Sequence, residues 1–214
     1  MIWINNLKNL WFEKLEFIEN VVKRFESTVT LRPPILDVGC GRCRFLDYLR
    51  KHNGIEAYGT DFSFTSMKQC HCVHNCVQAE CGVLPFAANT FRSITSILLI
   101  EHVPGYLGFL KETFRVLKQD GCIYLLFPNF HSLVTPALFL KRKIFRNTEI
   151  PYHEPLRLQN IKEKLEVLDF VILSVHFMSI TEYRNRVERI IGKIAGQILP
   201  DRFKEEIIII AKKR

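Results

Sequence analysis

The sequence lacks any long apolar run. Its longest ones, such as Ile97 to Ile100 and Ile207 to Ala211, fall far below the roughly 20 residues that a membrane helix needs. The stretch from Met1 to Phe17 likewise has no uninterrupted apolar centre and no small-residue cleavage site. These absences exclude a spanning segment and disfavour a secreted product, so we expect a cytoplasmic location.

The cysteines lack the pattern of a disulfide scaffold. Their number is odd, and their spacing suggests no small stapled fold, so they are expected to be reduced cytosolic thiols. They are Cys40, Cys43, Cys70, Cys72, Cys76, Cys81 and Cys122. The net charge of +8 is spread along the chain and does not choose between nucleic acid, anionic lipid and an acidic small molecule.

The chain also has no internal repeat and no low-complexity tract. A length of 214 residues suffices for one well-buried core and is short for two, so residues 1–214 are predicted to form a single domain. Hydrophobic residues at 48% and charged residues at 24% are typical of an ordinary globular protein.

Strand and helix patterns alternate five times, which predicts an α/β fold with a right-handed, doubly wound, mostly parallel sheet. The expected strands are 35–38, 56–61, 75–79, 93–100 and 122–127, with helices over 42–51, 62–70 and from Gly105 to Lys118. An amphipathic helix is predicted over 6–26, within an N-terminal region 1–30. It either covers a ligand cleft or packs as an interface or core helix. An irregular insertion covers 130–158.

The stretch Pro34 to Phe45 organises this pattern, because an apolar strand ending in Asp37 runs into Gly39 and Gly41. A strand that turns tightly into a helix is where an α/β sheet holds a nucleotide-like ligand. Asp61 follows Gly41 by twenty residues, at the end of the second strand. A carboxylate there can accept hydrogen bonds from both hydroxyls of a ribose.

From Pro34 to Asn129 this sequence resembles the class I S-adenosylmethionine-dependent methyltransferases, and in particular the type 11-like methyltransferase domain. The first motif is the glycine turn just described, and the later motifs follow in the family's order. They are Glu80 before Leu84-Pro85-Phe86, the segment Ile100-Glu101-His102-Val103, the turn Arg115 to Gly121, and the strand end Phe127-Pro128-Asn129. A pair of C-terminal strands, 171–178 and 207–212, would close a Rossmann-like, seven-stranded sheet with a C-terminal antiparallel strand, as in that family.

The resemblance implies an enzyme that binds S-adenosyl-L-methionine. Asp37 would hold the loop and the ammonium end of the cofactor, while Gly39, Cys40 and Gly41 would allow close backbone approach. Glu80 would accept from the adenine amino group. The full predicted cofactor site is Asp37, Gly39, Cys40, Gly41, Asp61, Phe62, Glu80, Cys81 and Ile100, with the carboxylates at 37, 61 and 80 converging on the nucleoside at one rim of the sheet.

Two positions depart from the family pattern. Cys43 stands at the third glycine of the first motif, and Gln119-Asp120 replace Pro-Gly in the later turn. These departures are the support for an alternative, a non-catalytic methyltransferase-fold binding or scaffolding subunit. A nicotinamide-dependent dehydrogenase is disfavoured, because its glycine fingerprint would require glycine where Arg44 stands.

Two cysteine motifs allow further hypotheses. The segment Cys70 to Cys76 holds soft and borderline metal ligands within seven residues, but no second ligand pair with finger-like spacing follows it. The sequence therefore predicts no metal site. Cys40-Gly41-Arg42-Cys43 is a Cys-x-x-Cys at a helix N-terminus, which would suit a redox switch at the cofactor loop.

Methyl transfer is an in-line displacement on the sulfonium methyl, and a base is needed only where the acceptor must lose a proton. His102 and His153 are the candidate catalytic bases, and either could instead be structural. The expected acceptor is a small or lipid-like molecule, methylated at oxygen. An RNA acceptor is the further alternative, disfavoured because the chain has no Asn-Pro-Pro-Tyr or catalytic Pro-Cys segment. Peripheral membrane contact through the apolar and basic stretch 137–146 and the oligomeric state stay open.

Overall fold

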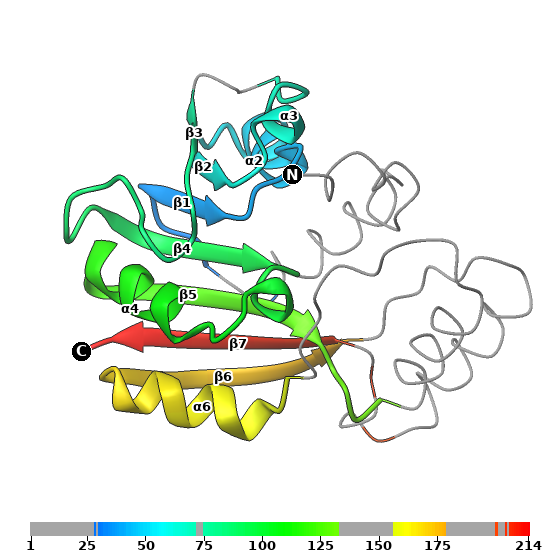
Figure 1. Cartoon of the computed structure of the whole chain (residues 1–214), viewed down its shortest axis with the longest axis vertical. Coiled ribbons are helices and arrows are strands. Elements are labelled where there is room, and N and C mark those ends of the chain that lie inside the picture. The colour runs from blue at the N-terminus through cyan, green and yellow to red at the C-terminus, as the bar shows by residue number, and fades with distance from the viewer. Residues whose placement is uncertain are drawn as a thin grey trace, which may run out of the picture.

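The computed structural model describes residues 28, 30–71, 75–132, 156–178, 200, 204 and 206–214 (Figure 1). Most of the predicted N-terminal helix region, 1–30, lies outside these ranges, and so does most of the predicted insertion, 130–158. In the part of the chain that is described, no helix is both long enough and apolar enough to cross a membrane.

One seven-stranded sheet forms the middle layer of the molecule. Its strand order is β3-β2-β1-β4-β5-β7-β6, and β7 is antiparallel to both of its neighbours while β1 to β5 are parallel (Figure 1). The predicted α/β class and the C-terminal antiparallel strand are confirmed. The strands are β1 (Ile35–Val38), β2 (Tyr58–Asp61), β3 (Cys76–Gln78), β4 (Phe91–Ile97), β5 (Leu117–Pro128), β6 (Phe170–Met178) and β7 (Glu206–Lys213).

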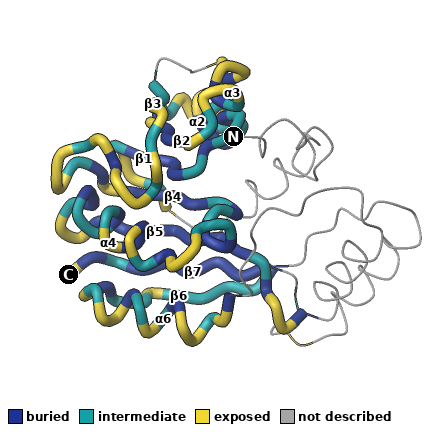
Figure 2. Tube along the Cα trace, viewed as in Figure 1, coloured by how far each residue is buried: buried dark blue, intermediate teal, exposed yellow. Residues whose placement is uncertain are grey.

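Helices cover both faces of the sheet, as its apolar strands require. On one face pack α2 (Arg44–Asn53) and α3 (Phe64–Met67), through side chains such as Leu46 and Met67. On the other pack α4 (Leu107–Val116) and α6 (Leu158–Val167). Figure 2 shows the central strands as the most buried part of this sandwich. The two cores fix the sheet and leave the carboxyl ends of its parallel strands free to build a site.

Local end signals mark the helices near the site. Gly54 ends α2 in the left-handed conformation, with φ of 64°, and its N–H reaches back to the carbonyl of Arg50. Ser63 caps α3 by accepting a hydrogen bond from the N–H of Ser66 at 3.3 Å. Both ends are therefore set by residues next to the helix in the sequence.

The largest boundary difference lies between α4 and β5. The helix ends at Val116, and the strand begins at Leu117, five residues before the predicted start at Cys122. The reason is a register shift: Leu117 pairs with Phe91, and regular pairing resumes where Cys122 meets Ser93. Asp120 lies within this irregularity at φ of 59°, at the position where the resembled motif has glycine.

Candidate active site

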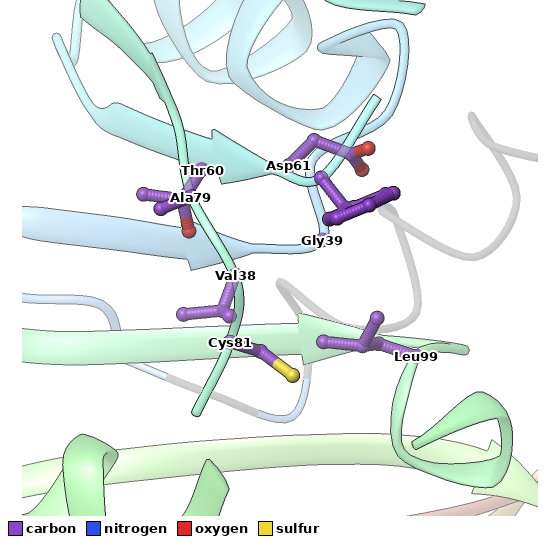
Figure 3. Close-up of a pocket in the computed structure, with 8 residues that line it drawn as sticks. Val38, Gly39, Thr60, Asp61, Ala79, Cys81 and Leu99 are labelled. Carbon is purple, nitrogen blue, oxygen red and sulfur yellow. The ribbon is translucent and has the colours of Figure 1, made fainter. Parts of the chain in front are cut away.

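A pocket opens at the carboxyl ends of the parallel strands, where β1 and β2 end and where the chain leaves β3 and β4. Its lining is mainly apolar with one carboxylate, and consists of Val38, Gly39, Thr60, Asp61, Phe62, Ala79, Cys81 and Leu99 (Figure 3). The pocket encloses about 90 Å³. This is below the roughly 300 Å³ at which ligand pockets usually begin, so a ligand of nucleoside size would extend beyond these residues.

Asp61 is the charged group of the pocket, and it also fixes the glycine turn. Its Oδ2 accepts a hydrogen bond from the N–H of Gly41 at 2.8 Å, and its Oδ1 accepts one from the N–H of Ser63 at 2.7 Å. Burial raises the pKa of Asp61, and the two backbone bonds act in the opposite direction. A carboxylate offers about four acceptor positions, so capacity for a ligand diol is left.

Gly39 gives the backbone its close approach to the pocket. Its φ is 80°, and a Cβ built on it would lie 2.9 Å from Leu99, which lines the same pocket. The N–H groups of Gly39 and Cys40 both donate to the carbonyl of Thr60, which holds the turn against β2. Figure 3 shows Asp61 and Leu99 on opposite sides of Gly39. A side chain at position 39 would therefore collide with Leu99, which lines the pocket, and would strain the backbone.

Phe62 and Cys81, both predicted to bind the cofactor, line the pocket. Phe62 is 61% exposed, so its ring is accessible to a ligand. Glu80, predicted to bind adenine, is exposed and stands between the lining residues Ala79 and Cys81, but it is not itself part of the lining.

Asp37 is not part of the described pocket lining. Its carboxylate is buried, and its Oδ1 accepts a hydrogen bond from Thr95 Oγ1 at 2.7 Å. Burial is the chief reason why its pKa is raised to about 7, and the charge of Asp61 also raises it. Thr95 is its register partner on β4, so the side chain lies along the sheet face. The convergence of carboxylates 37, 61 and 80 around the cofactor stays a prediction, and of the three Asp61 lines the described pocket.

The segment after β4 turns into η4 (Ile100–His102), a short 3₁₀ helix that follows the pocket residue Leu99. Ile100 is fully buried in the core and is not part of the described lining. His102 is partly exposed, and its Nε2 lies 4.0 Å from Oε1 of Glu101. His153, the other predicted base, lies outside the described residues.

Sequence reasoning did not single out Glu101 as a functional residue. It is 1% exposed, and burial raises its pKa to about 8. Its Oε2 has no hydrogen-bond partner among the described residues. A buried carboxyl group with an open acceptor position is costly to keep and is a recognised mark of functional sites. The signal in the sequence was a lone acid within the apolar stretch Leu98 to Val103.

The expectation that all seven cysteines are reduced thiols is also corrected. Cys43 and Cys70 form a disulfide, which joins the N-cap of α2 to the turn after α3. Cys43 takes the left-handed conformation, with φ of 56°, at the position where the resembled motif has its third glycine. Cys40 points away from the pocket into the core beneath β2, where Gly59 makes room for its sulfur.

The lining suits S-adenosylmethionine on three counts. Asp61 can accept from the ribose hydroxyls, Phe62 and Cys81 offer a flat and mainly apolar slot for the adenine, and Gly39 admits the ligand to the backbone. The sheet order and the position of this pocket at the carboxyl ends of the strands are those expected of the class I S-adenosylmethionine-dependent methyltransferase fold.

Comparison with known proteins supports the same activity. Residues 36–125 match the family model described as a methyltransferase domain, which supports an S-adenosylmethionine-dependent methyltransferase. It is 29% identical over 215 residues to an uncharacterized protein of Methanocaldococcus jannaschii, covering 92% of this chain and 87% of the relative. It is 37% identical over 110 residues to a demethylmenaquinone methyltransferase of Staphylococcus saprophyticus, covering 47% of each chain, so it spans about half the length of that relative.

A solved structure shows the same fold over nearly the whole chain. The crystal structure of a SAM-dependent methyltransferase from Archaeoglobus fulgidus superposes with a TM-score of 0.71. The two chains are 23% identical, and the match covers 94% of this chain and 95% of that one. The similarity at this level concerns the arrangement of the elements.

Proposed function

We propose that this methyltransferase acts on a hydroxyl group of a small, lipid-like acceptor, with His102 as the base and Glu101 as its supporting acid. The main support for the proposal is the pairing of Glu101 with His102. A carboxyl group that is 1% exposed lies beside an imidazole whose side chain is 31% exposed, one turn beyond the pocket residue Leu99. Such a pair can take up a proton at the edge of the cofactor site.

Bound S-adenosylmethionine supplies the activated methyl group. His102 accepts the proton of the acceptor hydroxyl, and its exposure allows the acceptor to reach it. Glu101 in its carboxylate form stabilises the resulting imidazolium. Because the pKa of Glu101 is about 8, the carboxylate form grows as the pH rises through 8, and the rate of methyl transfer should rise with it.

A lipid-like acceptor is supported by a relative. The relative from Staphylococcus saprophyticus is named for demethylmenaquinone, a quinone, although this chain spans only about half of it. A cytoplasmic location with contact to a membrane surface fits such an acceptor and stays a prediction.

The test is a methyl-transfer assay that follows release of S-adenosylhomocysteine. The acceptor panel holds hydroquinones with and without a prenyl tail, a simple phenol, an amine of similar size, and unmodified transfer RNA. We expect turnover with the hydroquinones, and a loss of about 10²-fold or more in kcat for His102→Ala. Methylation of the amine or of RNA, with none of the phenolic acceptors, would refute the acceptor class. Tight cofactor binding with no turnover on any acceptor would favour the non-catalytic alternative.

A further inference from the structure

Four cysteine sulfurs meet beneath the cofactor loop, outside the pocket. Cys43 Sγ is bonded to Cys70 Sγ, and lies 3.3 Å from Cys76 Sγ and 3.8 Å from Cys40 Sγ. The sulfurs of Cys40, Cys43 and Cys76 all lie within 4.8 Å of one another. Their residues come from the loop after β1, the turn after α3 and the first position of β3. Methyl transfer as derived above uses none of these sulfurs.

We propose that Cys40, Cys43, Cys70 and Cys76 form a tetrathiolate site for one Zn²⁺ ion when the Cys43–Cys70 disulfide is reduced. Four thiolates around zinc at about 2.3 Å form a tetrahedron with edges of about 3.8 Å. The Cys40–Cys43 separation of 3.8 Å equals that edge, and the Cys43–Cys76 separation of 3.3 Å is shorter by about half an ångström. The bonded sulfurs of Cys43 and Cys70 must move apart when their bond is reduced. A mononuclear ion suits it better than an iron–sulfur cluster, whose thiolates bind separate irons and so stand farther apart.

The ligand pairs were separate in the sequence. Cys40-x-x-Cys43 has the short spacing of a zinc ligand pair, and it precedes the segment from Cys70 to Cys76 by 26 residues. The fold brings the two together because β1 and β2 are adjacent in the sheet and β3 pairs with β2. The second ligand pair therefore exists, on the N-terminal side of the segment.

The surroundings suit a structural ion. Cys40, Cys43 and Cys70 are buried, Cys76 is partly buried, and apolar side chains such as Met67 pack around them. Cys43 is the N-cap of α2, a ten-residue helix. The partial positive charge at the N-terminus of this helix favours thiolates there.

Two backbone positions fit the cluster. Cys43 adopts a left-handed φ that costs a non-glycine residue about 1 kcal/mol, so a cysteine stands where glycine is easier. Gly59 leaves space for both Leu46 and the sulfur of Cys40, since a Cβ on it would lie 2.7 Å from the Leu46 side chain and 2.8 Å from Cys40 Sγ. A side chain at position 59 would displace one or both of these groups.

The chemistry balances with a dithiol as reductant. The S–S bond between Cys43 and Cys70 breaks, each sulfur gains one electron and one proton, and the dithiol becomes a cyclic disulfide. Zn²⁺ then displaces four thiol protons and forms four Zn–S bonds. The ion would tie the loop that carries Gly39 and Gly41 to α3 and β3, and so hold the floor of the cofactor pocket from below.

The experiment uses the full chain, reduced under anaerobic conditions and freed of reductant. We expect one Zn²⁺ per chain by elemental analysis after incubation with zinc chloride and removal of loose metal. Substitution with Co²⁺ should give the sulfur-to-metal charge-transfer and d–d bands of a tetrahedral tetrathiolate. Cys76→Ser and Cys70→Ser should weaken zinc binding about 100-fold in competition with a chromophoric chelator. The matched control is Cys122→Ser, a buried cysteine of β5 outside the cluster, which should bind as the parent does.

A second readout does not depend on the variants folding. In the parent chain, zinc should protect four thiols from alkylation, identified by mass spectrometry as positions 40, 43, 70 and 76, while Cys81 and Cys122 react as they do without the metal. Folded, fully reduced protein that retains no stoichiometric metal would overturn the proposal. So would zinc binding that is unaffected by both serine variants, one iron per chain in place of zinc, or protection at Cys72 in place of Cys70.

Discussion

The carboxylates at the two ends of the candidate site differ in burial and in hydrogen bonding. At the end of β2, both oxygens of Asp61 accept backbone N–H groups, at 2.8 and 2.7 Å, and the carboxylate is held in one position. Beyond the end of β4, Glu101 is more deeply buried, and its Oε2 has no hydrogen-bond partner in the described part of the chain. The first arrangement suits holding a ligand, and the second suits exchanging a proton.

The difference follows from what surrounds each group. Asp61 stands beside a glycine turn and the start of α3, where free N–H groups are available to stabilise its charge. Glu101 stands in a 3₁₀ turn whose neighbours, Ile100 and Leu99, are apolar. Its charged form is therefore disfavoured, and its pKa is raised to about 8.

The largest effect is expected from Asp61→Ala. The change removes the predicted ribose acceptor and the hydrogen bonds that Asp61 accepts from Gly41 of the glycine turn and from Ser63 at the start of α3. The Kd for S-adenosylmethionine should therefore rise at least about 100-fold, or about 2.7 kcal/mol. Calorimetric titration measures it. The control is Glu166→Ala, an exposed acid of α6, which should bind as the parent does. Parent-like affinity in Asp61→Ala would show that the cofactor site has been assigned to the wrong residues.

The next effect concerns Glu101→Gln and the rate of methyl transfer. The amide keeps the shape but cannot support the imidazolium of His102, so kcat should fall about 10- to 100-fold. The rise in rate through about pH 8 should also disappear, since the ionising group is gone. Steady-state rates from pH 6 to 9 measure both. A variant that keeps the parent's pH profile would mean that Glu101 is a structural acid.

The same substitution should change how stability depends on pH. In the parent, the unfolded Glu101 ionises near its ordinary value of 4.5, while the folded group holds its proton until about 8. Between these values the parent loses up to about 1.4 kcal/mol of unfolding free energy per pH unit, and Glu101→Gln does not. Urea unfolding at pH 5, 7 and 9 should show that the unfolding free energy of Glu101→Gln increases relative to that of the parent as the pH rises. Parallel curves for the two proteins would contradict the raised pKa.

A smaller effect is expected where the cofactor rim meets α4. Arg115 donates to the carbonyls of Leu84 and Phe86 and to Glu112, whose Oε2 accepts the N–H of Leu84. Arg115→Ala should cost about 1–3 kcal/mol of unfolding free energy, because the turn that follows Cys81 loses these bonds. Arg115→Lys is the matched control and should recover only part of the loss, since an ammonium cannot reproduce the fork of the guanidinium. If both variants were as stable as the parent, the hydrogen bonds of Arg115 would not stabilise this turn.

The smallest effect should come from Asp120→Gly. Asp120 has φ of 59°, a conformation that glycine adopts without strain, so the change should stabilise the chain by up to about 1 kcal/mol. The lost ion pair with Lys212, at 3.1 Å, is exposed and offsets little of this gain. Denaturant unfolding measures it. A loss of more than about 1 kcal/mol would show that the aspartate is required and not merely tolerated there.

Much of the fold was accessible from the sequence, because it rests on local patterns. Apolar strands alternating with amphipathic helices predicted the sheet. The sequence also placed Gly39 and Gly41 after β1 and Asp61 at the end of β2, because strand ends and a twenty-residue spacing are properties of one β-α-β unit. It did not show that the side chain of Asp37 is buried beside Thr95, since that contact depends on the pairing of β1 with β4. It also missed Glu101, because burial is decided by distant elements that pack over a residue.

The class of fold and the position of the cofactor turn follow from the amino-acid sequence, since both depend on contacts between residues close along the chain. Which distant side chains come into contact depends on the tertiary structure. Cys43 and Cys76 are 33 residues apart, and their sulfurs come within 3.3 Å only because β1, β2 and β3 lie side by side. Contacts of that kind depend on the packing of the whole sheet, and no spacing along the chain specifies them.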